Sequence, residues 1–203
     1  MLRKLLFLIL VTVFSVFTTF SQNELKDGDI IFQTSHSGQS LAIQLATKSP
    51  YSHCGIIFFK NGKAQVLEAV QPVKVTPLSK WIKRGDGSHY VIKRLITHKE
   101  DLNPAVIKRM HSIGSELVGK NYDLYFGWND DKIYCSELVW KIYKRGVGIE
   151  VGQLKKLKDF DLSSPVVKNI LKKRYGNKIP YNETVISPEG IFNSNKLYTV
   201  VKK

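Results

Sequence analysis

The sequence predicts an α+β domain in which a small antiparallel sheet packs against helices. Short runs rich in branched and aromatic residues predict strands, and Asn61-Gly62 joins two of these runs as a strong hairpin signal. Elsewhere in the chain, apolar residues recur at helical spacing, which predicts helices around the sheet. No repeat or linker-like stretch divides the sequence, so we expect one domain.

The predicted strands are short and bounded by turn residues. Asp27-Gly28-Asp29 forms the turn before the first strand, and Pro72–Pro77 is expected to be a connection between elements. The predicted strands are Ile30–Phe32, Tyr51–Phe59, Ala64–Val70, His89–Leu95 and Leu197–Val201.

The predicted helices follow from apolar spacing and from residues typical of helix ends. Asn103-Pro104 is typical of a helix start and Gly119 of its end, with a core stripe between them. Two shorter helices are predicted at Leu41–Thr47 and Leu78–Lys83. Further helices are predicted from Ser136 to a stop at Gly146, from Ser163-Ser164-Pro165 through Leu171, and at Ser187–Phe192.

Residues 1–21 have the composition of a secretory signal peptide. Two basic residues precede an apolar run from Leu5 to Phe17, and small residues follow before Gln22. A transmembrane anchor needs about 20 apolar residues, more than this run supplies, so we favour cleavage and a mature domain over residues 22–203. No cysteine lies near the cleavage point, so we expect export to the periplasm or extracellular space without a lipid anchor.

The chain is strongly basic, with a formal net charge of +14, of which +12 remains after residues 1–21 are removed. In an exported protein, such charge favours contact with anionic wall polymers, lipid headgroups or surface polysaccharide. A solvated basic surface explains the charge equally well. No nucleic-acid recognition motif accompanies it, so we expect no nucleic-acid partner, and no feature predicts a stable protein partner.

Cys135 is the first candidate for chemistry because it lies at or just before a predicted helix N-terminus. The unpaired N–H groups and the dipole there favour the thiolate, the nucleophilic form of cysteine. Leu138, Val139 and Ile142 form the apolar stripe of this helix, and Glu137 lies in its first turn. The alternative is that Cys135 is a small buried apolar side chain, and a base elsewhere is needed to decide.

The Asn61-Gly62 hairpin supplies a candidate base and a candidate orienting carboxylate. A two-residue turn pairs Lys60 with Lys63, and this register places His53 and Glu68 on one face as diagonal neighbours, about 7–8 Å apart at Cα. A register shifted by one residue would turn Glu68 to the other face.

The second cysteine, Cys54, follows His53 directly in the predicted strand. Side chains alternate along a strand, so Cys54 is expected on the face opposite His53 and turned away from Cys135. A disulfide between the cysteines is disfavoured on this ground, although an exported protein permits one. The remaining histidines are scattered, so we expect no metal site and no cofactor.

These residues suit nucleophilic catalysis by cysteine. Such catalysis needs a thiolate, a histidine that shares and returns its proton, and a group that orients the imidazole. Cys135, His53 and Glu68 can fill these roles, and the backbone N–H of Cys135 can donate to an oxyanion. Tyr134 and Ser52, the neighbours of the two reactive residues, are further candidates for contacts with the substrate or the oxyanion.

Several segments together resemble the YaeF/YiiX (YiiX-like) family of permuted papain-like cysteine amidohydrolases. That family is related to NlpC-type cell-wall peptidases and, more distantly, to lecithin:retinol acyltransferase. The segments are Leu25–Phe32, Tyr51–Ile56, Glu68-Ala69, Gly119–Asp123, Tyr134–Val139 and the tail from Ile186 to Tyr198.

The resemblance implies a circularly permuted papain-like (NlpC-type) fold, with Cys135 as nucleophile, His53 as base and Glu68 as orienting residue. The histidine and the glutamate precede the cysteine in the chain, as the permuted group requires. Cys54 is a departure, since an aliphatic residue would be ordinary there.

The sequence therefore predicts an exported cysteine hydrolase that cleaves an amide or ester bond through a thioester intermediate. A cell-wall peptide fits export and the NlpC relationship. An acyl lipid or fatty amide fits the other relatives and the basic surface. The alternative from a different class is a cell-wall or lipid binding protein on the same fold, with an inactive triad.

Overall fold

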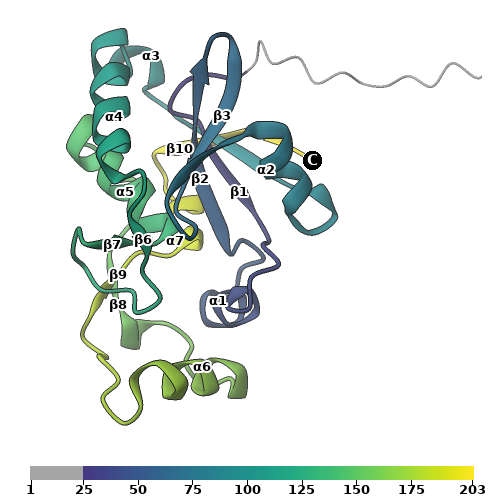
Figure 1. The fold of residues 1–203 in the computed structure, drawn as a ribbon, viewed down its shortest axis with the longest axis vertical. Coiled ribbons are helices and arrows are strands. Elements are labelled where there is room, and N and C mark those ends of the chain that lie inside the picture. The colour runs from purple at the N-terminus through teal and green to yellow at the C-terminus, as the bar shows by residue number, and fades with distance from the viewer. Residues whose placement is uncertain (1–24) are drawn as a thin grey trace, which may run out of the picture.

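A six-stranded antiparallel sheet forms the centre of the fold (Figure 1). The structure is a computed structural model and describes residues 25–203, so the predicted signal peptide lies outside the described residues. The strand order is β10-β5-β1-β2-β3-β4. The strands are β1 (Ile30–Gln33), β2 (His53–Lys60), β3 (Lys63–Glu68), β4 (Lys74–Pro77), β5 (Val91–Leu95) and β10 (Leu197–Lys202).

The helices agree with the predicted ones at most positions. In α4, the Asn103 side chain accepts hydrogen bonds from the backbone N–H groups of Ala105 and Val106, which caps the first turn as the sequence predicts. The four-residue α3 was not predicted. The helices are α1 (Ser40–Thr47), α2 (Leu78–Arg84), α3 (His98–Asp101), α4 (Pro104–Leu117), α5 (Cys135–Gly146), α6 (Pro165–Tyr175) and α7 (Pro188–Phe192).

The predicted β2–β3 hairpin and its register are confirmed. Lys60 pairs with Lys63, and the pairing continues to Ile56 with Leu67. Asn61 and Gly62 both have positive φ, at 51° and 72°, as a two-residue type I′ turn demands.

The prediction that Pro72–Pro77 only connects elements is wrong, because part of it forms β4. Its residues Lys74 to Pro77 pair with β3 in antiparallel register. This strand lies at the edge of the sheet, where a proline costs no ladder hydrogen bond on its open side. The prolines of this segment therefore led to the wrong prediction of a connection where an edge strand forms.

The two faces of the sheet bury different cores because side chains alternate along each strand. Ile30, Ile56 and Cys54 lie in the core that includes α4 and α5. Ile31 and Ile57 pack on the other face with Trp81 of α2. Figure 1 shows α4 and α5 on one side of the sheet and α2 on the other.

A second region lies beyond one end of the sheet and contains α1, α6 and two short strand pairs (Figure 1). The pairs are β6 (Asn121–Tyr122) with β7 (Lys132–Ile133), and β8 (Lys155–Lys156) with β9 (Thr184–Val185). Among the helices of residues 25–203, none combines the length and apolar character that a membrane span needs.

Candidate active site

Cys135 is the first residue of α5, as the sequence predicts. Glu137 closes the first turn by accepting a hydrogen bond of 3.3 Å from the backbone N–H of Tyr134. Cys135 is almost fully buried, and the first N–H groups of a helix lack intrahelical acceptors. The position therefore combines an enclosed sulfur with the donor end of a helix.

His53 and Glu68 meet where β2 begins and β3 ends. Nε2 of His53 lies 2.7 Å from Oε2 of Glu68. The Thr76 hydroxyl donates to Oε1 of the same carboxylate at 2.7 Å, and the Arg84 guanidinium donates to Oε2. Burial alone would raise the pKa of Glu68, but the hydrogen bonds from His53, Arg84 and Thr76 outweigh it and bring the pKa to about 2. Glu68 is therefore ionised and held by three donors.

The pKa values of Cys135 and His53 are shifted in opposite directions, which favours a thiolate beside an imidazolium. Burial would lower the pKa of His53, but hydrogen bonds with Cys135 and Glu68 raise it to about 9. A hydrogen bond from the Cys54 side chain contributes most to holding the pKa of Cys135 well below its usual value, and His53 adds to this against the effect of burial. Since Nε2 of His53 faces Glu68, Nδ1 remains for the exchange of a proton with Cys135.

The prediction that the two cysteines face different ways is wrong. Cys54 does lie opposite His53 in the strand alternation, but α5 packs on the face of β2 that carries Cys54, so both cysteines share one core. His53, as the first residue of β2, reaches Cys135 from the end of the strand. Both thiols are free. Burial and the Cys135 charge raise the pKa of Cys54 well above its usual value, so Cys54 is the donor of the pair.

Tyr134 and Ser52, the two further candidates, lie beside the site but bind within the protein. The Tyr134 hydroxyl accepts a hydrogen bond of 3.1 Å from the backbone N–H of Ile186. The Ser52 hydroxyl lies 2.7 Å from that of Ser40 and accepts from the backbone N–H of Ser35 at 2.9 Å. Ser52 therefore fixes the loop before α1, and Tyr134 fixes the loop after β9.

The sequence analysis missed Tyr122 and Gln39. Burial and the nearby charge of Cys135 raise the pKa of the Tyr122 hydroxyl well above its usual value, so this hydroxyl lies beside the thiol. Nε2 of Gln39 donates to that hydroxyl at 2.7 Å. Tyr122 lies in one of the segments that carry the family resemblance, which was a usable signal. Gln39 lies in a polar loop, and nothing in its spacing singles it out.

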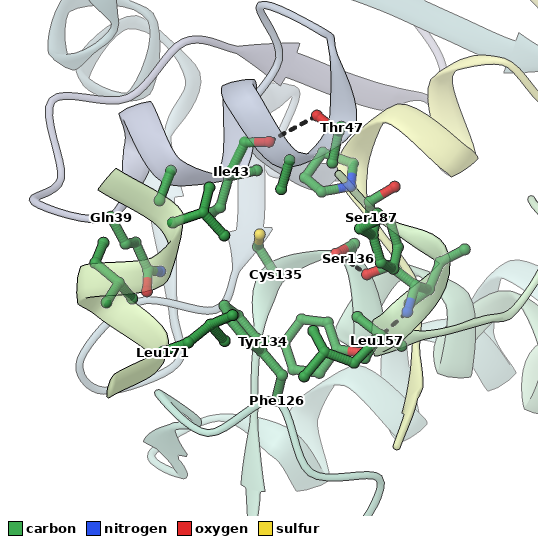
Figure 2. A pocket seen from close by; sticks show the side chains of 18 of the residues that line it. Gln39, Ile43, Thr47, Phe126, Tyr134, Cys135, Ser136, Leu157, Leu171 and Ser187 are labelled. Carbon is green, nitrogen blue, oxygen red and sulfur yellow. Dashed lines mark hydrogen bonds between the residues drawn. The ribbon is translucent and has the colours of Figure 1, made fainter. Parts of the chain in front are cut away.

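An apolar pocket of about 90 Å³ opens beside Cys135, whose side chain projects into it (Figure 2). Ile43 of α1 and Leu171 of α6 lie on one side of the pocket, and Phe126, Tyr134 and Leu157 lie around the rest (Figure 2). Segments far apart in the chain thus enclose an apolar space beside Cys135.

A larger, open cleft of about 1020 Å³ lies on the His53 side of the site. Its lining includes the loop before α1, the segment Ala69–Gln71 that follows β3, and α6. Gln39, Tyr122 and Arg174 line both the cleft and the apolar pocket. Cys135 and His53 therefore lie between an enclosed apolar pocket and a more open cleft whose lining also carries charged side chains.

Residues 24–201 of the chain match the family described as permuted papain-like amidase enzyme, YaeF/YiiX, C92 family. The chain is 48% identical to the uncharacterized protein YiiX of Escherichia coli K12 over 178 residues, which cover 88% of this chain and 87% of that protein. It is also similar to a crystal structure from Escherichia coli O157:H7, described as metalloprotein yiiX. That match has a TM-score of 0.84 and 47% identity and covers 89% of this chain and 98% of that one.

A metal site would need a cluster of ligating side chains. Within residues 25–203, no group of three or more histidine, cysteine, aspartate or glutamate residues is arranged to hold a metal ion. The donor set of the described residues therefore does not fit a resident metal.

Proposed function

Since the chain belongs to the permuted papain-like amidase family and is an enzyme of that papain-like type, we propose that Cys135, His53 and Glu68 are its catalytic triad. The observation that carries this proposal is the 2.7 Å contact between His53 and Glu68 beside Cys135 at the start of α5. The raised pKa of His53 and the lowered pKa of Cys135 support it. A vestigial triad in a binding protein would have no need of a depressed thiol pKa at the mouth of a pocket.

The proposed reaction begins with attack of the Cys135 thiolate on the carbonyl carbon of an amide. The carbonyl oxygen takes up negative charge and faces the N–H groups at the start of α5, which can stabilise it. The C–N bond then breaks, and His53 donates its proton to the leaving nitrogen. Water attacks the resulting thioester while His53 accepts a proton from it. The C–S bond breaks, which releases a carboxylic acid and restores the Cys135 thiolate and the His53 imidazolium.

The substrate class that we favour is a fatty amide or another acyl compound. The pocket next to Cys135 is lined by apolar side chains such as Ile43, Phe126 and Leu171, and burial of an alkyl chain there would gain about 0.8 kcal/mol per methylene group. A cell-wall peptide carries charged and polar groups, which such a lining could not compensate on desolvation. The apolar pocket therefore favours the acyl substrate over the peptide.

We also propose that the enzyme acts outside the cytoplasm, as its first 21 residues predict. The acyl substrate would then come from the cell envelope. The net charge of +12 on residues 22–203 favours an encounter with anionic envelope surfaces.

The test compares the purified wild type with Cys135→Ala on two substrates, palmitoyl p-nitroanilide and purified peptidoglycan. We expect the wild type to release palmitate and p-nitroaniline, the variant to release neither, and the peptidoglycan to stay intact by mass spectrometry. If peptide products form from peptidoglycan and no palmitate is released, the substrate is a cell-wall peptide and the acyl-substrate proposal is wrong. No product from either substrate would favour the binding protein.

A further inference from the structure

Arg174 stands where the apolar pocket meets the open cleft. It lies in the last turn of α6 and lines both spaces. Its guanidinium donates a hydrogen bond of 2.6 Å to Oε1 of Gln39 and lies 5.1 Å from the centre of the Phe126 ring. Gln39 in turn donates to Tyr122, which contacts the nucleophile. Arg174 is therefore linked through Gln39 and Tyr122 to the surroundings of Cys135.

The positive charge of Arg174 has no carboxylate contact within the described residues. The charge of Asp123 acts on Arg174, but its carboxylate accepts hydrogen bonds from the backbone N–H groups of Tyr125 and Gly127 instead. By contrast, the buried Arg94 has the carboxylate of Asp29 as its ion-pair partner.

Partial burial lowers the pKa of Arg174. Burial of a cation is costly unless an anion pairs with it. In the described part of the chain, the guanidinium of Arg174 contacts only a neutral amide and an aromatic ring. It is therefore suited to bind an anionic group of a ligand.

The cleft around Arg174 has a positive lining. Arg84 and Lys173 also line it, whereas no aspartate or glutamate does so among the described residues. Arg84 donates to Glu68, but 40% of its side chain remains exposed toward solvent. At the rim, His36 lies 3.8 Å from Asp86, and both side chains are largely exposed. An anion in the cleft would thus meet cations on two sides.

The proposed transfer of a proton from His53 determines which part of the substrate lies in the cleft and which lies in the apolar pocket. His53 lines the cleft and must deliver its proton to the leaving nitrogen, so the leaving amine lies in the cleft. Cys135 lines the apolar pocket, where the acyl chain would remain as the thioester. This assignment rests on the triad and acyl substrate proposed above.

We propose that the cleft binds an anionic group on the leaving amine, with Arg174 as the residue that selects it. The substrate class is then a long-chain acyl amide of an amine that carries a carboxylate or a phosphate. In the net reaction, water cleaves the acyl C–N bond and yields a fatty acid and the free anionic amine. Arg174 touches the substrate but takes no part in proton transfer.

The test measures kcat/KM on matched substrate pairs that differ in charge. One pair is N-palmitoylglycine and N-palmitoylglycinamide, and the other is N-palmitoyl-O-phosphoethanolamine and N-palmitoylethanolamine. We expect the wild type to prefer the anionic member of at least one pair about tenfold or more, mainly through a lower KM. The pair that shows the larger preference identifies the anion as carboxylate or phosphate.

Variants on one helix separate a binding role of Arg174 from a structural one. Arg174→Gln should abolish the preference for the anionic member, whereas Arg174→Lys, which keeps the charge, should retain part of it. Lys172→Gln removes an equal charge from an exposed position of α6 that lines neither space, so it should keep the wild-type preference.

Three results would contradict the proposal. Equal cleavage of charged and neutral members by the wild type would overturn the role of the cleft while leaving the amidase proposal intact. A preference that Arg174→Gln does not reduce would remove Arg174 from that role. Failure of the wild type to cleave any of the four amides would overturn both the selectivity and the acyl amide substrate.

Discussion

Glu68 determines the charge state of the proposed reactive pair. Its carboxylate has three donors and no exposed surface, so it stays ionised beside His53 and favours the imidazolium. The sequence predicted Cys135, His53 and Glu68 because a hairpin turn and a helix start are local signals. Thr76, Arg84 and Cys54 complete their surroundings, and these could not be predicted, since each depends on how separate elements pack.

Glu68→Gln should leave the fold intact and lower kcat by about 10²-fold or more, because the amide neither stabilises the imidazolium nor orients it as the carboxylate does. The measurement is steady-state turnover of a chromogenic palmitoyl amide, with circular dichroism as the check on folding. Glu116→Gln makes the same chemical change at an exposed position of α4 and serves as the control. Wild-type turnover in Glu68→Gln would show that the carboxylate has no catalytic role.

The rate should follow a bell-shaped pH profile with its alkaline limb near pH 9. The pKa of His53 is raised to about 9, so the imidazolium that protonates the leaving nitrogen is present below that pH and lost above it. The pKa of Cys135 is held well below its usual value, so the thiolate persists into the acidic range. The measurement is kcat/KM between pH 4 and 11.

The rate of alkylation by iodoacetamide is an independent measure of whether Cys135 is a thiolate. It should label Cys135 at neutral pH and leave Cys54 unmodified, because the pKa of Cys54 is raised well above its usual value. An alkaline limb two pH units lower, or comparable labelling of both thiols, would be inconsistent with the ionic pair.

At the scale of elements, the hairpin and α5 were predictable because their signals lie within short stretches of sequence. Asn61-Gly62 determined the register, and that register brought His53 within reach of Glu68. The edge strand β4 was not predictable, because its pairing with β3 outweighs a proline-rich composition. The face of β2 on which α5 packs was not predictable either, and this led to the wrong orientation of Cys54 relative to Cys135.

Gly55→Ala should destabilise the hairpin and displace Glu68. A Cβ atom at this position would lie 2.5 Å from Cγ1 of Val66 and 2.8 Å from the backbone oxygen of Leu67, and 3.4 Å from Cβ of Glu68. Such overpacking costs about 1–3 kcal/mol, and turnover should fall as well. The free energy of unfolding in urea measures the cost.

Gly38→Ala is the matched control for that stability measurement. An added Cβ at Gly38 meets no heavy atom within 4 Å, so its free energy of unfolding should stay within about 0.5 kcal/mol of the wild type. A Gly55→Ala protein as stable and as active as the wild type would show that β2 and β3 can separate without harm to the site.

For the whole molecule, the α+β class and the permuted papain-like family were predictable from the sequence, since strand, helix and motif signals agree. The apolar pocket was not, because α1, α6 and the segments around Leu157 and Ile186 enclose it only after the chain has folded. The positive cleft likewise joins residues as distant as Arg84 and Arg174. Overall charge indicated an anionic counterpart but could not locate its binding site.

Export is the prediction that depends on residues 1–21. Expression of the full sequence in a bacterial host should yield a protein in the periplasm or medium whose N-terminus is Gln22, because the apolar run before it is too short for a stable anchor. Intact-mass measurement of the fractionated cells tests this. A chain that keeps its first 21 residues and stays with the membrane would contradict cleavage.

The residues proposed to react and the residues proposed to bind the substrate lie largely in different regions of the fold. The sheet and α5 carry the proposed nucleophile, base and orienting carboxylate, whereas α1 and α6 supply much of the lining of the pocket and the cleft. We therefore expect substitutions in α1 and α6 to change which substrates bind without moving the proposed triad. In evolution or in the laboratory, single substitutions in these two helices could therefore alter specificity step by step. The residues proposed to carry out the reaction would stay the same.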